Sequence, residues 1–403
     1  MAGLHSALLA FSLLLPNQDF HLTVSSKEKI AAGTVIQAAI PQNLSPAGAK
    51  VAVLKDAAGK EVALGQAILT SPLDKVAGKK LVTVLPELSV PPEGLILSGY
   101  WTNKDFDNTF SWKDINPELS QLSLGGKPVW QYVHPVLKEG KDREATYKPF
   151  HHVFDLNGLL VTKGPGGQFT HHRGLFLGFN KITYGNGIKV DIWHCKDDTH
   201  QAHDKVLFRE GGPVCAAEEV TILWKGKGKE TFATEQRELT VYQAPGGRLL
   251  EFQSEVKTTG GKIQLDGDPQ HAGFHFRASN EVADKTSKET IFIRPNGADK
   301  PGASKNWPQD KSQVNLPWLA MSFVLDGKRR SAVYLDHPSN PKESRFSERP
   351  YGRFGSYFEY EITPEKPLRL QYRVWLQDGQ IDVQSAVGKN EQFVNPPNAV
   401  ISK

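Results

Sequence analysis

The sequence predicts an all-β protein, in which a large antiparallel β-sandwich follows a small immunoglobulin-like β-domain. The chain has 403 residues, more than one hydrophobic core usually serves, so two folded domains are expected. Its 36 glycines and 26 prolines are spread along the chain and disfavour long helices. Short apolar runs of strand length recur between these breaks, and no window keeps the apolar periodicity of an amphipathic helix.

Composition and charge exclude several classes of protein. The chain carries 48 Lys and Arg residues against 44 Asp and Glu residues, a net charge of +4. This near balance argues against a protein built to bind nucleic acid or an acidic membrane surface. Apolar residues make up 39% of the chain, too few for a bundle of membrane-spanning helices. We therefore expect no nucleic-acid partner and no membrane span.

The N-terminus contains an apolar run, LLAFSLLL at residues 8–15, which has the length of a signal-peptide core and is too short to span a bilayer. No Lys or Arg precedes it, because the first is Lys27, and no A-x-A cleavage site follows. A buried N-terminal strand or a misassigned start codon would also explain the run. We expect residues 1–19 to be a signal peptide and the mature protein to be periplasmic or extracellular.

Residues 20–102 are predicted to form the small β-domain. Runs such as FHLTV, AKVAVLKD and GLILSGYW have strand length and composition, and turn signals separate them. Several such strands within so short a segment are typical of a small β-sandwich. The segment has no His after His21 and a single Trp, Trp101, so we expect it to contribute no catalytic group.

The second half of the prediction is the large sandwich. Residues 103–120 are polar and lack periodicity, which predicts a linker. The strand pattern resumes after it, and residues 121–397 are predicted to form one antiparallel sandwich. Its size approaches that of the broad two-sheet supersandwich of galactose mutarotase.

The two cysteines, Cys195 and Cys215, are too few for a disulfide-dense scaffold and form no C-x-x-C pair. Either they remain buried thiols or they form one bridge. We expect them to lie close enough to bridge if the protein is exported.

Histidine is the most informative residue type, because eight of the 13 histidines fall between positions 134 and 203. Imidazole transfers protons near neutral pH and is the commonest metal ligand in proteins. The sharpest motif is GPGGQFTHHRG at residues 164–174. Read as a strand, it places His171 and Arg173 on one face and His172 on the other. One histidine is expected to line a site with Arg173, and the other to be a hydrogen-bonded core residue.

The segment DIWHC is also read as a strand, with Asp191 and Trp193 on one face. A carboxylate beside an indole suits a sugar site, in which the ring stacks on the sugar and the carboxylate accepts hydroxyl protons. A core Trp with a locally bonded Asp is the alternative. His200 and His203 have metal-ligand spacing but lie in a charged stretch that is typical of a solvated loop. A divalent metal there is the lesser alternative, and the cofactor is unassigned.

Two later segments supply further candidates. HAGFHFR alternates, with His275 and Arg277 on one sheet face, where unpaired burial would be costly. Asp336 and His337 end an apolar strand at a proline-rich loop, a position where β-sandwich sites are often built. His151 is added as a substrate-binding candidate from the histidine-rich stretch.

Together, GPGGQFTHHRGLFLGF, VDIWHC, AGFHFRAS and AVYLDHPSNP resemble the family labelled methane-oxygenase PmoA-like, over roughly residues 120–385. Where that family has Asp-His ahead of its paired histidines, this chain has Gln168 and Phe169, which removes a carboxylate and an imidazole. True methane-oxygenase subunits are made of spanning helices, so methane oxidation is excluded. The setting of the family, among bacterial carbohydrate-degradation proteins, implies sugar chemistry.

The leading hypothesis is therefore an exported carbohydrate-active enzyme that acts on a glycoside or modified sugar. His171 or His172, together with Asp336 and His337, would supply acid–base catalysis. The substrate would be bound by Arg173, Asp191, Trp193, His275, Arg277 and His151. These segments are expected to converge on one concave face. The alternative is a non-catalytic carbohydrate-binding or cell-surface protein whose histidines are structural.

Overall fold

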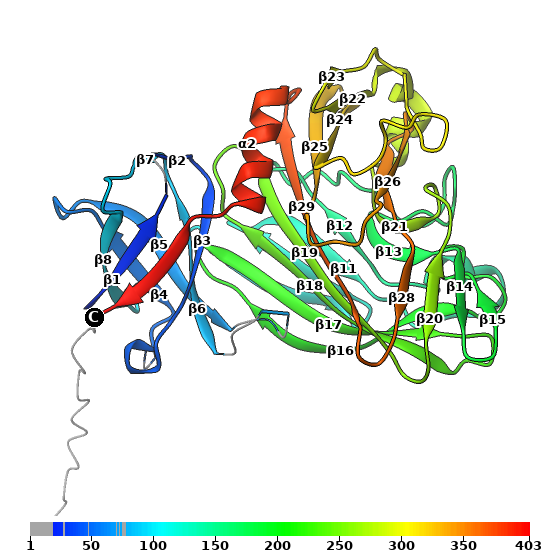
Figure 1. Ribbon diagram of the computed structural model, residues 1–403, viewed down its shortest axis with the longest axis horizontal. Helices are drawn as coiled ribbons and strands as arrows, with labels where there is room; N and C mark the ends of the chain where they lie inside the picture. The colour runs from blue at the N-terminus through cyan, green and yellow to red at the C-terminus, as the bar shows by residue number, and fades with distance from the viewer. Residues whose placement is uncertain (1–18, 27–28, 47, 70, 72, 75–77) are drawn as a thin grey trace, which may run out of the picture.

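Antiparallel β-strands dominate the computed structural model and form two lobes, a small one at the N-terminal end and a large one (Figure 1). The structure describes residues 19–403, except 27–28, 47, 70, 72 and 75–77. The predicted signal peptide therefore lies outside the described residues, apart from Asp19. No described helix is long and apolar enough to cross a membrane. The all-β fold class predicted from the sequence is confirmed.

The small lobe is built on one seven-stranded sheet whose two edge strands, β3 and β30, also contact each other. Along β1, Phe20, Leu22 and Val24 are buried while the residues between them face outward, as alternation requires. In sheet order the strands are β3 (Thr34–Ala39), β6 (Lys79–Leu85), β5 (Glu61–Leu69), β4 (Val51–Lys55), β8 (Leu95–Thr102), β1 (Asp19–Ser25) and β30 (Asn398–Ser402). A separate pair is formed by β2 (Lys29–Ile30) and β7 (Leu88–Ser89).

The large lobe contains two extended antiparallel sheets and a smaller third one, as the predicted large sandwich requires. The nine-stranded sheet runs β16 (His200–Glu210), β17 (Cys215–Lys225), β18 (Thr231–Tyr242), β19 (Arg248–Thr258), β29 (Leu368–Asp378), β25 (Lys328–Asp336), β24 (Trp318–Leu325), β22 (Ile291–Arg294) and β23 (Gly297–Ala298). The eight-stranded sheet runs β26 (Arg345–Arg349), β27 (Arg353–Tyr357), β21 (Ala272–Arg277), β13 (Leu175–Phe179), β12 (Phe150–Val153), β11 (Lys127–Val133), β10 (Leu119–Leu124) and β9 (Phe110–Asn116). The third sheet is β15 (Ile188–Val190), β14 (Lys181–Tyr184), β20 (Ile263–Asp266) and β28 (Tyr360–Ile362).

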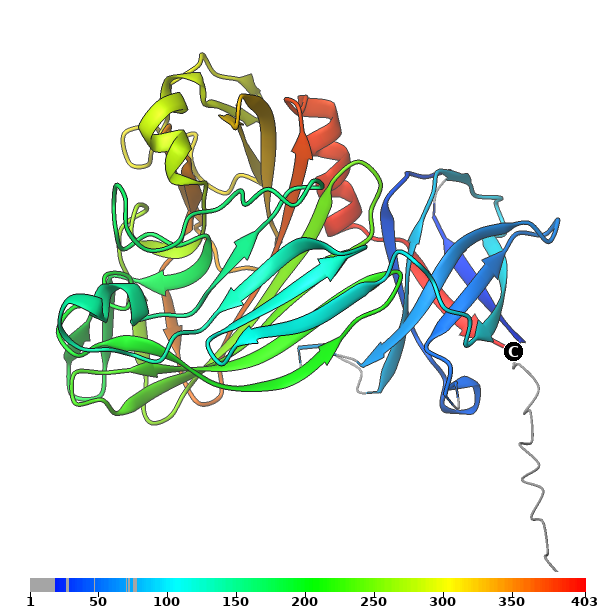
Figure 2. The same cartoon turned by 180° about the vertical axis from the view of Figure 1, so that it is seen from behind.

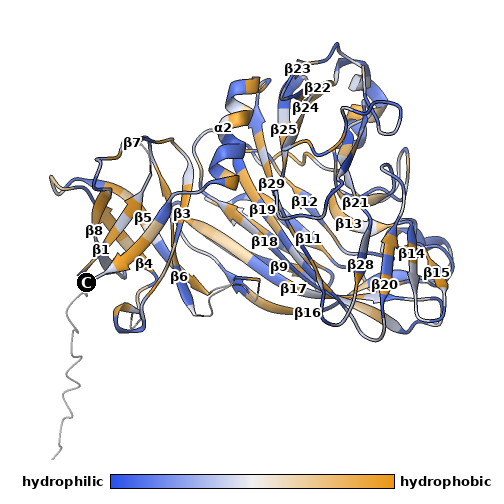
Figure 3. Ribbon diagram, viewed as in Figure 1, coloured by the Kyte–Doolittle hydropathy of each residue, from blue (hydrophilic) through white to orange (hydrophobic). Residues whose placement is uncertain are grey.

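The core of the large lobe lies between its two extended sheets. Phe274 on β21 stacks on Phe252 of β19 at a centroid distance of 4.2 Å and on Tyr372 of β29 at 4.9 Å. Apolar and polar residues alternate along many strands (Figure 3). In the nine-stranded sheet many of the polar residues are buried as well, among them Glu235, Arg237 and Glu251. The helical segments are η1 (Gln42–Leu44), η2 (Gly140–Asp142), α1 (Arg143–Thr146), η3 (Val282–Thr286), η4 (Ser287–Glu289) and α2 (Val383–Val394).

The linker predicted for residues 103–120 is too long, because β9 and β10 begin within it. In β9, Phe110 is buried and Trp112 packs against Trp130 with ring centroids 5.5 Å apart. The remaining residues of β9 are mostly exposed, since the strand forms the edge of its sheet. An edge strand with so few inward side chains has little of the apolar alternation that a sequence pattern requires.

The two lobes share an apolar interface beside α2 (Figure 2). Val35, Ile68 and Val82 of the small lobe belong to the same buried cluster as Val214, Cys215, Tyr242, Trp318, Trp375 and Phe393. The buried Gln66 side chain donates to the Cys215 carbonyl at 3.1 Å and accepts from the Val214 and Cys215 amides, both at 3.1 Å. Removing the small lobe would expose this cluster to water.

Of the two alternatives for the cysteines, the structure shows buried thiols, because Cys195 and Cys215 are both free and buried. Cys215 lies in β17 at the interface between the lobes, whereas Cys195 lies in a turn with its sulfur 3.2 Å from the Ile192 carbonyl oxygen. Burial raises the pKa of Cys195 to about 11 and that of Cys215 to about 12, so both are protonated near neutral pH.

Candidate metal centre

Three histidines from separate loops, His171, His194 and His271, meet beside the eight-stranded sheet and are called here the three-histidine cluster. Each offers one ring nitrogen, and these nitrogens all lie within 4.8 Å of one another. The ring centroids are 4.5 Å apart for His171 and His194, 4.9 Å for His194 and His271, and 6.0 Å for His171 and His271. Among the residues that the structure describes, this is the one group of three or more His, Cys, Asp or Glu residues so arranged.

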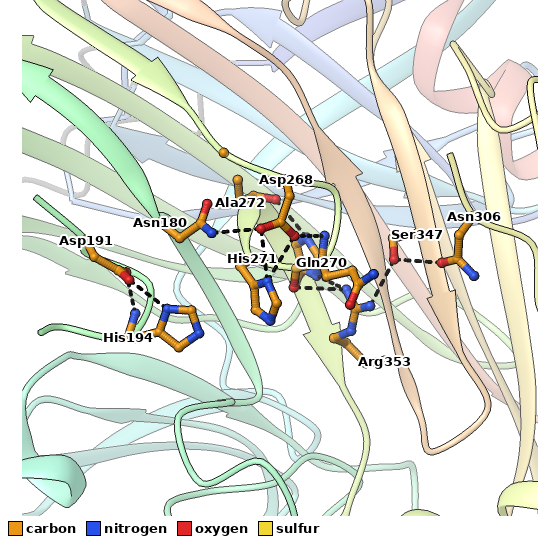
Figure 4. Close-up of polar contacts among 12 residues, drawn as sticks. Asn180, Asp191, His194, Asp268, Gln270, His271, Ala272, Asn306, Ser347 and Arg353 are labelled. Atoms are coloured by element: carbon orange, nitrogen blue, oxygen red, sulfur yellow. Dashed lines mark hydrogen bonds and ion pairs between the residues drawn. The ribbon is translucent and has the colours of Figure 1, made fainter. Parts of the chain in front are cut away.

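Two aspartates orient two of these imidazoles (Figure 4). His194 Nδ1 lies 2.8 Å from Asp191 Oδ2, and the His194 amide donates to Asp191 Oδ1 at 2.7 Å. His271 Nδ1 lies 2.9 and 3.1 Å from the two oxygens of Asp268. When Nδ1 is held by a carboxylate, Nε2 is left as the nitrogen that can bind a metal, and metal-ligating histidines show this pairing almost always.

The Asp268 carboxylate is itself fixed by its neighbours. Asn180 Nδ2 donates to it at 2.8 Å, and the Gln270 amide donates at 3.0 Å. Burial alone would raise the pKa of Asp268, but the hydrogen bonds from His271, Gln270 and Asn180 hold that pKa well below its ordinary value. Asp268 is therefore ionised near neutral pH and holds His271 in one orientation.

The loop that carries His171 is fastened by a lysine. Lys163 Nζ donates to the carbonyls of Gly166 at 2.7 Å, Phe169 at 3.0 Å and Gln168 at 3.1 Å. The His172 amide then closes a turn on the Phe169 carbonyl at 3.0 Å, with Phe169 at a positive φ of 56°.

Because of this turn, residues 164–174 do not form the predicted strand, and β13 begins only at Leu175. His171 and His172 therefore do not point to opposite faces, and their ring centroids lie 4.4 Å apart. Nε2 of His171 is buried and has no hydrogen-bond partner. Burial, followed by the nearby His194 and Lys148, lowers the pKa of His171 to about 2. Its imidazole is thus neutral, which is the form that binds metals.

The segment that carries His194 is a turn rather than the predicted strand. Arg143 donates to the carbonyls of Cys195 at 2.6 Å and Thr199 at 2.8 Å, and Lys148 Nζ donates to the Trp193 carbonyl. In a turn, residues three apart approach each other, so His194 lies beside Asp191 and not on the opposite face. Asp191 therefore orients a histidine, a role that the strand interpretation did not assign to it.

Trp193 cannot stack on a sugar, because its side chain is fully buried. It packs against Phe176 at 4.5 Å, His275 at 4.7 Å and His172 at 6.1 Å between ring centroids. The indole fills an apolar cluster beneath the histidines, so the platform predicted for it is wrong.

His275 and Arg277 share one face of β21, as the alternation predicted, with Phe274 and Phe276 in the core behind them. His275 Nε2 donates to the Ala272 carbonyl at 2.8 Å, and Nδ1 faces Arg353 Nη1 at 3.2 Å. The strand partner of His275 is Gly355, where an added Cβ would come within 2.7 Å of the imidazole ring. Glycine is therefore needed for His275 to lie flat across β27.

Three of the four predicted segments meet here, but Asp336 and His337 do not join them. Asp336 ends β25 and accepts hydrogen bonds from Asn340 at 2.7 Å and Lys342 at 3.0 Å. His337 bonds to Ser339 at 2.6 Å and packs against Phe393 of α2. The acid–base role predicted for this pair has no support in the structure, because their partners fix the loop after β25.

Arg173 and His151 also have structural surroundings. Arg173 is fully buried and donates to the backbone carbonyls of Thr170, His172 and Glu144, which fastens the His171 loop. His151 on β12 stacks on Tyr132 at a centroid distance of 4.8 Å. Neither belongs to the three-histidine cluster, and the contacts that the structure gives them are made within the protein.

The spacing of His200 and His203 does not produce a metal site. Both lie in β16, where residues three apart point to opposite sides. His200 Nδ1 bonds to the Asp198 carbonyl at 2.9 Å, whereas His203 Nδ1 bonds to the Tyr132 hydroxyl at 3.1 Å.

The sequence does contain a signal for the residues that were missed. His194 and His271 both follow an aspartate by three positions, in DIWH and DPQH. In a turn this Asp-x-x-His spacing lets the carboxylate reach Nδ1, and both copies do so. In the strand interpretation, His194 points away from Asp191, so the repeated Asp-x-x-His spacing was overlooked.

Space for a ligand adjoins the cluster. A cavity of about 440 Å³ reaches the outer side of the cluster: its lining includes Asp191, the partner of His194, and Asn180, the partner of Asp268, but none of the three histidines. Phe169 is 40% exposed, and its ring packs against Tyr351 with centroids 4.6 Å apart. Phe169 in turn lies next to His171 and His172, so an aromatic pair borders the histidines.

A family model for a family of unknown function, DUF6807, matches residues 120–389, which covers most of the large lobe and the whole histidine site. The chain belongs to this family. No curated protein matches the sequence of this DUF6807 member.

Among solved structures, this DUF6807 member is similar to an α-mannosidase from Enterococcus faecalis V583, with a TM-score of 0.39 and 11% identity over 96% of this chain and 46% of that one. A GH36 α-galactosidase from Geobacillus stearothermophilus gives a TM-score of 0.35 and 9% identity over 66% of this chain and 41% of that one. The chain thus spans less than half the length of either. These similarities are too low for an activity to be transferred.

Proposed function

We propose that this chain is a metal-dependent, carbohydrate-active enzyme in which His171, His194 and His271 hold one divalent transition-metal ion. The observation that carries the proposal is the donor arrangement. Three imidazoles converge from three loops, two have Nδ1 held by a carboxylate, and the third has a buried Nε2 without a partner.

Three histidine ligands leave coordination positions open, which is typical of catalytic rather than structural zinc sites. The side chains of His194 and His271 are 23% and 30% exposed, so the ion would be reachable from solvent. Imidazole suits zinc, copper, iron and nickel. Such an ion polarises a carbonyl or hydroxyl oxygen, or lowers the pKa of a bound water to produce a nucleophile.

The usual glycosidase mechanism fits this site poorly. That mechanism needs two carboxyl groups that flank the glycosidic bond, one to protonate the leaving group. The carboxylates in contact with the cluster are Asp191 and Asp268, and both are engaged with histidine Nδ1 atoms. The metal ion replaces the acid–base pair that the sequence suggested at Asp336 and His337.

The carbohydrate part of the proposal rests on the rim of the site and on the resemblance of the sequence to the methane-oxygenase PmoA-like family. Phe169 presents an exposed ring beside the histidines, a surface on which the apolar face of a sugar can stack. The adjoining cavity is large enough for a small sugar. Export to the periplasm or beyond would place the enzyme where polysaccharide fragments occur.

The test is metal analysis of the purified full chain together with a screen on oligosaccharides, nitrophenyl glycosides and 3-keto-glycosides. We expect about one zinc, copper, iron or nickel ion per chain, turnover of one substrate class, loss of turnover on chelation, and recovery on adding the metal back. His194→Ala should abolish both metal binding and turnover. His203→Ala, a change of the same type outside the cluster, should keep both properties. Turnover that continues in a chain without bound metal and is unaffected by a chelator would overturn the proposal. A chain that holds metal and binds sugars but turns none of them over would also overturn it.

A further inference from the structure

The cavity on the outer side of the three-histidine cluster is polar. Its volume is about 440 Å³, and 12 described residues line it. Ten of them have polar or charged side chains, and none is aromatic. Four are lysines, for which we call it the lysine cavity: Lys181, Lys189, Lys196 and Lys227. Because no aromatic ring offers a surface for the apolar face of a sugar, a ligand in this cavity would be held by hydrogen bonds and charge.

The four-stranded sheet of the large lobe places several of these side chains on one face. Thr183 of β14 lies opposite Lys189 of β15 and opposite Gln264 of β20. Lys181, two residues before Thr183 and therefore on the same face, lies opposite Asp266. The alternate residues of these strands are buried in the core: Ile182, Val190 and Leu265. Strand alternation thus fixes two lysines, a hydroxyl and an amide on the face that borders the cavity.

The positive charge of the lysine cavity is only partly offset by its three aspartates, because each of these already has a partner. The pairs are Asp191 with His194, Asp266 with the Tyr357 hydroxyl at 2.7 Å and Asp197 with Lys227 at 2.9 Å. Lys181 and Lys189 are exposed, and neither forms an ion pair with a residue that the structure describes. Water solvates an exposed ammonium group, so these two charges are open to a ligand that enters from solvent.

Two residues of the cavity wall connect it to the proposed metal centre (Figure 4). Asp191 holds Nδ1 of His194 at 2.8 Å, and Asn180 donates to Asp268, the partner of His271, at 2.8 Å. The cavity therefore begins one side chain away from the nearest proposed ligand. A divalent ion held by the cluster would add positive charge at this end and strengthen the attraction of the cavity for an anion.

We infer that the lysine cavity is a subsite for an anionic sugar unit, so that the substrate is an oligosaccharide that carries carboxylate or sulfate groups. This inference rests on the proposed function, because it names the substrate class of that site. The ammonium groups of Lys181 and Lys189 would bind the anionic group through charge-assisted hydrogen bonds. Thr183 and Gln264 lie between the lysines and the next strand, where they can bind ring hydroxyls. Lysine is a flexible point charge, so it accepts either a carboxylate or a sulfate.

The experiment measures binding of three trisaccharides to the full chain by calorimetry, before and after chelation: trigalacturonate, its methyl ester and galactotriose sulfated at the 6-positions. The ester keeps the sugar chain and removes the charge. We expect an anionic trisaccharide to bind about tenfold more tightly than the ester at low salt, and the difference to shrink as salt screens the exposed lysines. The double variant Lys181→Gln, Lys189→Gln should remove this preference. The matched control is Lys113→Gln, Lys127→Gln, which removes two exposed lysines of β9 and β11 outside the cavity.

The outcomes separate the two proposals. If neither anionic trisaccharide binds more tightly than the ester to a chain that holds its metal, the anionic subsite is overturned and the metal centre stands. A preference that chelation removes and the Lys181, Lys189 double variant keeps also overturns the subsite, because the metal ion and not the lysines then binds the anion. A preference that the double variant removes in a chain that never holds metal supports the subsite and refutes the metal enzyme. Where the subsite is supported, the tighter of the two anionic trisaccharides shows whether the group is a carboxylate or a sulfate.

Discussion

The large lobe contains two histidine clusters that differ in what surrounds them. In the three-histidine cluster, two Nδ1 atoms are held by aspartates. The second, which we call the aromatic histidine cluster, consists of His134, His151 and His203 around Tyr132.

In the aromatic histidine cluster the rings of His134 and His151 stack on Tyr132. The His203 ring meets Tyr132 edge-on and bonds to its hydroxyl. No carboxylate in the described chain bonds to its histidines. Two groups of similar composition are therefore suited to different tasks. Carboxylate partners, rather than histidine density, distinguish the proposed ligand set from a packed core.

The largest expected effect is the loss of a ligand. His271→Ala should lower the affinity of the full chain for Zn²⁺ by more than about 100-fold, since loss of a first ligand exceeds the effect of losing a carboxylate behind it. Competition with a chelating dye measures this affinity. His203→Ala in the aromatic histidine cluster is the control and should leave it unchanged. Equal losses in both variants would mean that the clusters do not differ as proposed.

Loss of an orienting carboxylate should have a smaller effect. Asp268→Asn keeps the size of the side chain but removes the charge that holds His271, and zinc affinity should fall by about 10- to 100-fold. Asp204→Asn, next to His203 and without a bond to any histidine ring, should change nothing in the same titration. An unchanged affinity in Asp268→Asn would show that the Asp-x-x-His pairing does not serve a metal.

The aromatic histidine cluster should make the free energy of unfolding decrease in acid. Burial, followed by the nearby His134, lowers the pKa of His203 from 6.5 to about 4. Between these values the unfolded chain binds the proton and the folded chain does not, so stability should decrease as the pH falls through this range. The slope contributed by one such group is at most about 1.4 kcal/mol per pH unit. Urea unfolding of the chelated protein at pH 7.5, 5.5 and about 4.5 measures it.

His203→Gln supplies the comparison for this prediction. The variant should lose that part of the slope, and the difference between the two proteins should grow as the pH falls. Parallel stability curves for the two proteins would contradict the prediction, because they would show that His203 titrates at its ordinary pKa.

The smallest effect concerns the Tyr132 hydroxyl. Tyr132→Phe removes its hydrogen bond to His203 and should lower the free energy of unfolding by about 0.5–1.5 kcal/mol without changing zinc affinity. Tyr100→Phe in the small lobe is a control for the loss of a hydroxyl outside the cluster. A change in zinc affinity in Tyr132→Phe would connect the two clusters.

Strand periodicity predicted much of the fold and part of the site. The alternation of Phe274 and Phe276 with His275 and Arg277 gave the correct faces of β21, because both sides of that strand are packed. The same reading failed for the loops that carry His171 and His194. There, a turn joins side chains that a strand would separate. The His171 loop is fastened by Lys163, which lies just ahead of it in the sequence, and the His194 turn by Arg143, which lies 52 residues before Cys195.

Other features depend on tertiary pairing and leave little trace in local sequence. The separate location of Asp336 and His337 follows from where β25 ends relative to the sheet edges, and no local pattern specifies that position. Arg277 was a candidate from its face alone, but its lack of a carboxylate partner becomes evident only when every neighbouring chain segment is in place.

The pairing of β30 with β1 affects how the protein is made. These two strands are neighbours in the sheet of the small lobe, yet almost the whole chain separates them. During synthesis, β1 leaves the ribosome first and has to wait for its partner until the large lobe has been translated. The domain that is made first is therefore completed last, contrary to the usual N-terminal-first order of folding. Until then β1 has an open edge, which a chaperone or a second nascent chain could occupy.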